Sequence, residues 1–156
     1  MKHIATFAAG CFWGVEAKFR QLPGVVTTRV GYTAGHTVDP DYKLVCQGDT
    51  GHAEAIEVTF DDTRVSYDEL LQFFWTIHNP TTLNRQGPDV GTQYRSAVFY
   101  HDEGQHQQAL AMKTYLDETG VFDGPIVTEI TAAETFYPAE EYHQCYLEKQ
   151  GRGSCH

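Results

Sequence analysis

The sequence predicts an α+β domain in which helices pack on a mixed β-sheet. Three observations support this fold class. The length of 156 residues suits a single domain. Short apolar strands alternate with amphipathic helices, and a third strand follows the second with no evident helix between them, which disfavours a purely parallel sheet. The resulting β-α-β-β-α-β order is typical of a ferredoxin-like α/β plait, here with extra elements, long loops and an extended C-terminal tail.

The first half of the chain supplies three strands and one helix. Residues 3–9 alternate loosely and predict the first strand. Apolar residues at helical spacing predict a helix over 12–22, which a Pro-Gly pair stops. The β-branched stretch 25–32 and the alternating stretch 53–60 predict the next two strands. Residues 33–52 between them form a long polar loop, and loops of this length in compact domains tend to be functional.

The second half repeats the alternation of helices and strands. Ser66 and Glu69 form a capping box in front of an apolar helix that ends near residue 78. A second polar loop follows over 81–93. The remaining predicted elements are a strand at 94–101, a helix at 103–120, a strand at 126–133 and a tail that begins helical, 134–156.

Composition and charge exclude several classes of protein. The net charge of −10 repels phosphate backbones, so we expect no nucleic-acid partner. No stretch approaches the roughly 20 apolar residues of a membrane span, and the start MKHIATFAAG lacks the features of a signal peptide. We therefore expect a cytoplasmic protein that does not associate with membranes. Its cysteines are too few and too spread for a disulfide scaffold, so they are free, metal-bound or catalytic thiols: Cys11, Cys46, Cys145 and Cys155.

The segment AAGCFWGVEAKF, residues 8–19, places Cys11 where the first strand turns into the first helix. The N–H groups at a helix N-terminus stabilise a thiolate, and Gly10 permits a tight turn. Cys11 therefore suits a nucleophile, with a small buried hydrophobe as the alternative. Phe12 and Trp13 point about 100° apart on the helix. At least one of them can line an apolar surface that accepts a methyl or thioether group.

GCFWG at 10–14 resembles the signature of the A-type peptide methionine sulfoxide reductases. Four further segments resemble the other sequence blocks of that family, in the same order: GYTAG at 31–35, TGHAEAIEV at 50–58, NRQGPDVGTQYRSAVF at 84–99 and EYHQCYL at 141–147. Together they span nearly the whole chain. The resemblance implies an enzyme that reduces methionine (S)-sulfoxide, peptide-bound or free, to methionine.

The resemblance also assigns the central catalytic roles. Cys11 is implied to attack the sulfoxide sulfur and to become a sulfenic acid as methionine leaves. Glu54 is implied to protonate the sulfoxide oxygen. A carboxyl group can do so near neutrality only if apolar surroundings raise its pKa. A solvated glutamate at a strand edge is the alternative for Glu54.

Further residues are implied to bind the substrate. Tyr32 and Tyr94 match family positions whose hydroxyls polarise the S=O bond, and Asp89 matches an acidic position that orients water or substrate. Phe12 and Trp13 are implied to form the methyl-binding wall. Core tyrosines and a turn aspartate are the alternatives. The segment His78-Asn79-Pro80 departs from the family pattern, since Asn79 stands where Asp is more common, and Pro88 also varies; we expect changed loop hydrogen bonding rather than changed chemistry.

A second thiol must reset the sulfenic acid by condensing with it to a disulfide. Cys155, in the glycine-containing end GRGSCH, is favoured because many relatives carry their resolving cysteine in such a tail. Cys145, in a segment that we predict to be helical, is the other candidate, as resolver or as a relay thiol, and Cys46 is given no redox duty. The resemblance implies thioredoxin as reductant and no cofactor. We expect one catalytic domain over 1–156, with 148–156 as a mobile tail.

Three other functions compete with this interpretation. A zinc module would use His143, Cys145, Cys155 and His156, but their spacing does not match usual structural zinc sites, and we expect no metal. A cysteine hydrolase would need a histidine such as His3, His36 or His52 within reach of Cys11. A domain that only binds methionine-rich partners would not need the Cys11 thiol.

Overall fold

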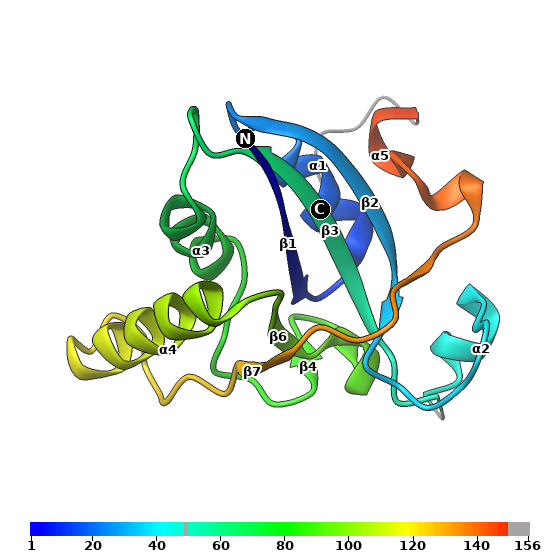
Figure 1. Cartoon of the computed structure of the whole chain (residues 1–156). Coiled ribbons are helices and arrows are strands. Elements are labelled where there is room, and N and C mark those ends of the chain that lie inside the picture. Colours follow the sequence, from blue (N-terminus) through cyan, green and yellow to red (C-terminus); the bar gives the residue numbers. More distant parts are fainter. Residues whose placement is uncertain (49, 150–156) are drawn as a thin grey trace.

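A six-stranded sheet organises the chain (Figure 1). The computed structural model describes residues 1–48 and 50–149. Its elements in chain order are β1 (Lys2–Ala9), α1 (Phe12–Phe19), β2 (Val25–Thr33), α2 (Tyr42–Cys46), β3 (Ala53–Asp61), α3 (Tyr67–Thr76), β4 (Arg85–Gln86), β5 (Asp89–Val90), the 3₁₀ turn η1 (Thr92–Tyr94), β6 (Ser96–Tyr100), α4 (Glu103–Glu118), β7 (Glu129–Ala132), β8 (Tyr137–Pro138), the 3₁₀ turn η2 (Glu141–His143) and α5 (Tyr146–Lys149).

The strand order in the sheet is β7-β6-β1-β3-β2-β8. The four central strands, β6-β1-β3-β2, pair antiparallel with one another and have the order of a ferredoxin-like plait, in which each helix crosses over one intervening strand. The outer strand β7 pairs in parallel with β6, which makes the sheet mixed. The predicted fold class is therefore confirmed.

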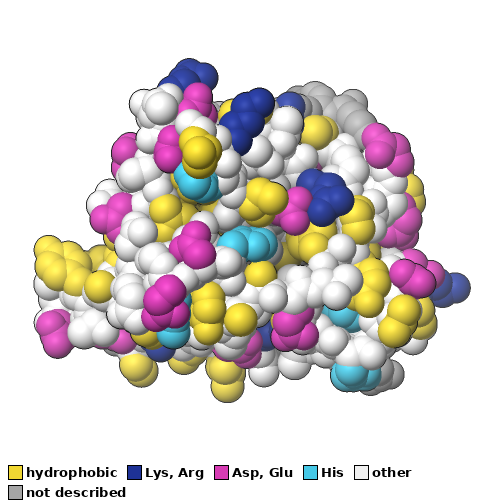
Figure 2. Space-filling model, viewed as in Figure 1, with side chains coloured by type: hydrophobic (Ala, Val, Ile, Leu, Met, Phe, Trp, Pro, Cys, Tyr) yellow, Lys and Arg dark blue, Asp and Glu magenta, His cyan; other side chains and the backbone are white. Residues whose placement is uncertain are grey.

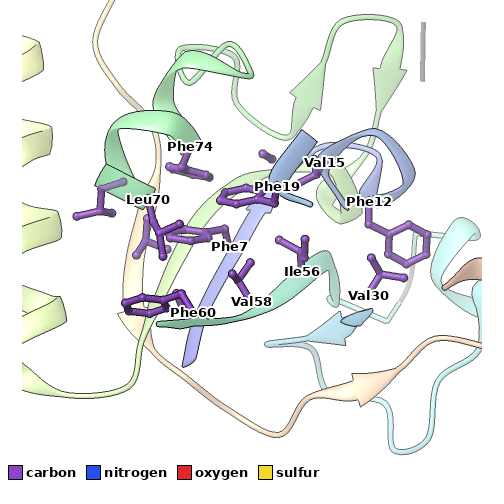
Figure 3. Close-up of a cluster of buried hydrophobic side chains, with 14 of the residues drawn as sticks. Phe7, Phe12, Val15, Phe19, Val30, Ile56, Val58, Phe60, Leu70 and Phe74 are labelled. Carbon is purple, nitrogen blue, oxygen red and sulfur yellow. The ribbon is translucent and has the colours of Figure 1, made fainter. Parts of the chain in front are cut away.

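Helices α1 and α3 cover one face of the sheet and enclose the main core (Figure 3). Apolar side chains at alternate positions of each strand point to this face because successive strand residues face opposite sides. Phe7 of β1 stacks against Phe19 of α1 and Phe74 of α3, with ring centroids 5.3 Å and 5.1 Å apart. The core thus fixes the position of α1 on the sheet, and with it the residue that precedes α1.

The opposite face of the sheet carries small side chains and is covered by extended chain. Ala8, Ala55 and Ala97 are buried there together with Phe99, against Phe136. After β7 the chain runs across this face and pairs through β8 with the edge of β2 (Figure 1). The predicted tail therefore starts in extended conformation, and the expectation of a helical start was wrong. The physical reason is that the chain satisfies its backbone groups by pairing with an open strand edge.

Other local features match the sequence or refine it. Ser66 and Glu69 form both hydrogen bonds of the predicted capping box. The two predicted loops contain short elements that their polar sequences conceal, namely the helix α2 and the hairpin of β4 and β5. Acidic side chains are spread over the face shown in Figure 2 instead of forming one patch, as expected for charge that serves solvation. Within residues 1–48 and 50–149, no helix has the length and apolar character needed to cross a bilayer.

Candidate active site

Cys11 lies at the junction of β1 and α1, where the sequence predicts it. It is the N-cap residue of α1, so it precedes the first helical turn, and its carbonyl oxygen accepts the Val15 N–H at 3.3 Å. The residue is partly exposed and does not belong to the buried core. Gly10 before it has a φ of +96°, a conformation that glycine adopts without strain. The turn therefore presents a thiol beside the N-terminal N–H groups of a helix.

Glu54 lies directly beside this turn. It is the second residue of β3 and shares the helix-covered face with Ile56, so its side chain points toward α1. The backbone N–H of Phe12 donates a hydrogen bond to Oε1 of Glu54 at 3.2 Å. The other oxygen, Oε2, is buried and has no hydrogen-bond partner among the described residues.

The surroundings of Glu54 favour the neutral carboxylic acid. Its residue is only 1% exposed. Burial raises the pKa of Glu54 to about 8, the negative charge of Cys11 adds to this, the Phe12 N–H opposes it, and the charge of Asp89 contributes a further increase. The predicted apolar environment is thus present, and the carboxyl group can hold a proton at neutral pH beside the candidate nucleophile.

Phe12 and Trp13 differ in burial but share two aromatic neighbours, Tyr42 and His143. Phe12 is buried in the core against Tyr32 and Tyr42, whereas Trp13 is only partly buried. The C-terminal segment fixes the indole of Trp13: its Nε1–H donates to Nδ1 of His143 at 2.9 Å. The ring of Tyr146 stacks on the indole at 4.0 Å between centroids. The result is an aromatic wall next to Cys11.

Tyr32 is placed differently from what its implied role requires. Cross-strand pairing sets it opposite Glu54, but its side chain is fully buried. Its hydroxyl donates to Oε1 of Glu140 at 3.1 Å, and burial together with the Glu140 charge raises the pKa of Tyr32. The hydroxyl is therefore already engaged on the C-terminal segment.

Tyr42 is the residue that sequence reasoning missed. It begins α2, which Asp41 caps by accepting the Leu44 N–H at 2.8 Å. Burial and the adjacent Cys46 thiol raise the pKa of Tyr42, and the charge of Glu54 contributes. The Tyr42 ring packs against Phe12, whose N–H bonds to Glu54, with the ring centroids 6.3 Å apart. The signal available in the sequence was the Asp-Tyr start of a helix inside the long loop.

Tyr94 and Asp89 reach the same place from the second loop. Burial raises the pKa of Tyr94, and the charge of Glu54 is the largest electrostatic contribution. Asp89 belongs to the hairpin of β4 and β5 and is partly buried. Its charge acts on Glu54, as described above. The structure therefore brings Glu54, Tyr42, Tyr94 and Asp89 together around the Cys11 turn.

Of the two candidate resolving cysteines, the structure describes Cys145 and not Cys155. Cys145 does not lie in a helix, contrary to the prediction; it stands between η2 and α5 with a φ of +53°. The physical reason is that its backbone N–H donates to the buried Glu16 of α1 at 2.6 Å, which holds the chain in a turn. Cys155 lies outside the described residues, as does the rest of 150–156 in the predicted mobile tail 148–156.

Two of the three histidines considered as a base for Cys11 in a hydrolase are hydrogen-bonded to other groups. His3 bonds to Asp62 at 2.8 Å. Both ring nitrogens of His52 bond to backbone groups, the N–H of Gly35 and the carbonyl of Thr37. Over the described ranges, no three potential metal ligands gather into a site. Half of the zinc set that the sequence offers, Cys155 and His156, lies outside those ranges.

Comparison with solved structures extends this picture. The reduced form of Mxr1 from Saccharomyces cerevisiae superposes with a TM-score of 0.91 at 38% identity, covering 99% of this chain and 88% of that one. Methionine sulfoxide reductase A of Corynebacterium diphtheriae gives 0.92 at 38% identity, with 99% and 77% covered. Yeast Mxr1 in complex with Trx2 gives 0.66 at 25% identity, with 93% and 84% covered.

Comparison of sequences gives the family. A protein of Methanothermobacter thermautotrophicus named peptide methionine sulfoxide reductase MsrA is 60% identical over 152 residues, which cover 97% of this chain and 90% of that protein. A protein of the same name from Methanosarcina acetivorans is 62% identical over 147 residues, which cover 94% and 78%. The model of the peptide methionine sulfoxide reductase family matches residues 3–156. The chain therefore belongs to the peptide methionine sulfoxide reductase family.

Proposed function

We propose that this protein reduces methionine (S)-sulfoxide, free or within a polypeptide, with Cys11 as nucleophile and Glu54 as general acid. The observation that carries the proposal is the contact between these two residues' segments: a buried carboxyl group with a pKa of about 8 accepts the N–H of Phe12, the residue after Cys11. A reaction that needs a thiolate and a proton donor in one place is served by this pair.

The reductive step balances with these two groups. The Cys11 thiolate attacks the sulfoxide sulfur while the proton of Glu54 passes to the sulfoxide oxygen. The oxygen is transferred to Cys11, which becomes a sulfenic acid, and methionine leaves. Cys11 sulfur is oxidised by two electrons and the substrate sulfur is reduced by two. The thiols of the chain supply the electrons, so the reaction requires no cofactor.

Tyr42 and Tyr94 are proposed to donate hydrogen bonds to the sulfoxide oxygen. Neutral hydroxyls polarise the S=O bond without adding charge to the site, and burial raises the pKa of both tyrosines, so both stay protonated. Tyr42 takes the role that the resemblance implied for Tyr32, whose hydroxyl is bonded to Glu140. Asp89 is proposed to orient the substrate or a water molecule from the hairpin.

Phe12 and Trp13 are proposed to hold the methyl group of the substrate. The indole of Trp13 is oriented by His143 and Tyr146, so its exposed surface has a fixed position next to the sulfur. An apolar wall of this kind favours the small CH₃–S end and excludes a charged group.

Recovery of Cys11 is proposed to proceed through a disulfide with Cys155, with Cys145 as the alternative resolving or relay thiol. Condensation of the sulfenic acid with a thiol releases water, and thioredoxin then reduces the disulfide. A yeast relative in complex with Trx2 supports this partner. Because thioredoxin and free thiols belong to reducing compartments, we propose the cytoplasm as the location.

A single-turnover experiment tests the function. The reduced protein is mixed with an excess of methionine (S)-sulfoxide without external reductant, methionine is quantified, and sulfenic acid is trapped with dimedone for peptide mass spectrometry. In the background of Cys145→Ser and Cys155→Ser, we expect about one equivalent of methionine and dimedone on Cys11. Methionine formed at the same rate by Cys11→Ser would contradict the proposal.

A further inference from the structure

The side chain of Gln86 lies between the turn that carries Cys11 and the hairpin that carries Asp89. Gln86 and Asp89 are directly paired across the two short strands β4 and β5. The hairpin is closed next to them by the N–H of Gly91, which donates to the carbonyl of Asn84 at 2.9 Å. Whatever holds Gln86 therefore also sets the position of Asp89.

The amide of Gln86 is held at both ends by a single backbone residue. The Asn79 N–H donates to Oε1 of Gln86 at 2.8 Å, and Nε2 of Gln86 donates to the Asn79 carbonyl at 2.8 Å. Only one orientation of the amide satisfies this donor and this acceptor, so the side chain has one bonded rotamer. Neither bond involves the Asn79 side chain, whose oxygen accepts from Thr81 instead. An aspartate at position 79 would offer Thr81 the same acceptor oxygen. The presence of Asn79 where the family more often has Asp therefore leaves both bonds to Gln86 unchanged.

Asn79 is in turn fixed to the core by its neighbour His78. Nδ1 of His78 bonds to the Phe74 carbonyl at 2.7 Å, and Nε2 bonds to the Ser96 hydroxyl at 2.7 Å. These contacts join the end of α3 to the start of β6. The Gln86 amide therefore connects the hairpin to the segment after α3 that His78 ties to α3 and β6.

The aliphatic part of Gln86 rests on Gly10. A Cβ placed on Gly10 would lie 2.7 Å from Cγ of Gln86 and 2.9 Å from its Cβ, distances that side chains do not tolerate. The hairpin thus lies directly against the residue that precedes the nucleophile. Gly10 is needed at this point for the close approach as well as for its positive φ.

From these contacts we infer that Gln86 is a positioning residue of the reductive step, which holds the Asp89 hairpin against the Gly10–Cys11 turn. This inference rests on the proposed function, because it concerns the step in which Cys11 and Glu54 act. Loss of the amide would remove both hydrogen bonds between the hairpin and Asn79 and leave the packing on Gly10 and the bond from the Thr82 hydroxyl to the Arg85 carbonyl. Small displacements of groups around a reacting centre have large effects on rate.

The pKa of Glu54 depends on whether the hairpin is in place. The groups that act on its carboxyl are Cys11 from the β1–α1 turn, Asp89 from β5 and the Phe12 N–H, and the hydroxyls of Tyr32, Tyr42 and Tyr94 come from β2, α2 and η1. Of these, only Asp89 lies in the hairpin, and Tyr94 follows directly after it. Withdrawal of the negative charge of Asp89 lowers the pKa of Glu54, so the proton donor is lost at a lower pH.

Two substitutions and one control test the inference. Gln86→Leu keeps the carbons that contact Gly10 and removes the amide. Gln86→Glu places an oxygen against the Asn79 carbonyl. Arg85→Ala is the matched control, since Arg85 lies on the same short strand and its guanidinium bonds to Gly87 within the hairpin. Each is measured in single turnover with methionine (S)-sulfoxide across pH, alone and combined with Asp89→Asn, and melting temperatures are recorded.

We expect Gln86→Leu and Gln86→Glu to slow methionine formation about tenfold at pH 7 and to move the alkaline limb of the pH profile to lower pH, with Arg85→Ala unchanged. In the Asp89→Asn background, Gln86→Leu should add less than about twofold, because residues that act through one another are not additive. If Gln86→Leu slows the reaction equally with and without Asp89→Asn, or leaves the alkaline limb at the same pH, the positioning role of Gln86 is overturned. The proposed function would still stand. If the unaltered protein forms no methionine, the proposed function fails as well.

Discussion

The backbone N–H of Phe12 donates to Oε1 of Glu54 at 3.2 Å, which ties a buried acid to the residue after the nucleophile. This hydrogen bond lowers the pKa of Glu54 by less than burial raises it, since the pKa is still raised to about 8. Oε2 has no partner in the described part of the chain. A buried carboxyl oxygen without a partner favours the protonated form, and it leaves a proton donor for a substrate oxygen.

The two tyrosines of this region should respond differently to loss of the hydroxyl. Tyr42→Phe is expected to slow single-turnover methionine formation about tenfold with little change in melting temperature, because it removes a donor to the substrate. Tyr32→Phe removes the hydrogen bond to Glu140, which costs about 1 kcal/mol of stability and lowers the melting temperature by about 2–4 °C. Its rate should stay within about twofold. A Tyr32→Phe variant slower than Tyr42→Phe would restore the role that the resemblance implied.

The resolving thiol can be assigned by substitution. Cys155→Ser is expected to form about one equivalent of methionine and then stop in the presence of thioredoxin, because the sulfenic acid finds no resolving partner. Cys145→Ser should continue to cycle, since the Glu16 carboxylate holds the Cys145 backbone in place. Steady-state methionine production with thioredoxin measures both. Continued cycling by Cys155→Ser, with arrest of Cys145→Ser, would move the resolving role to Cys145.

Protonation of His78 should make the fold less stable as the pH becomes acidic. Burial lowers the pKa of His78 to about 4, with Lys18 adding to the effect and the bond to the Phe74 carbonyl opposing it. An unfolded histidine has a pKa of about 6.5, so between these values the unfolded chain binds the extra proton. The free energy of unfolding should therefore fall as pH falls through this window. Between pH 6.5 and 5 the loss is about 2 kcal/mol relative to His78→Gln, measured by urea unfolding.

Other groups titrate in the same window, and the comparison removes them. His101 and His143 also have lowered pKa values, and both are present in the His78→Gln variant. Their contributions cancel in the difference between the two proteins. A difference in unfolding free energy that stays constant from pH 6.5 to 5 would show that His78 does not titrate there.

The sequence predicted β1, β2, β3, β6 and β7, the main helices and the position of Cys11 because local patterns determine them. Alternation along β3 and the capping box at Ser66 need no knowledge of distant residues. The burial of Glu54 could be inferred from family resemblance alone, since an isolated glutamate near a strand end is more often solvated. Its environment comes from α1, β2 and the two loops, which only the folded chain brings together.

Three of the features that the sequence did not reveal depend on contacts with other segments of the chain. Tyr42 and Tyr32 lie ten residues apart, and both bond to Glu140, far along the chain. Tyr32 does so through its hydroxyl and Tyr42 through its backbone N–H, and that difference distinguishes them. Gln86 has no local signal, because its partners Asn79 and Gly10 lie on other segments. Cys145 was misassigned to a helix because the buried Glu16 that fixes its turn lies in α1.

The pH dependence of single-turnover methionine formation, compared between the unaltered protein and Glu54→Gln, tests the central claim most directly. The unaltered protein should lose rate above about pH 8 as Glu54 gives up its proton. Glu54→Gln should be slower by about 100-fold below that pH and should lack the alkaline limb, so the two rates converge at high pH. An alkaline limb that persists in Glu54→Gln, or equal rates at pH 7, would contradict the account.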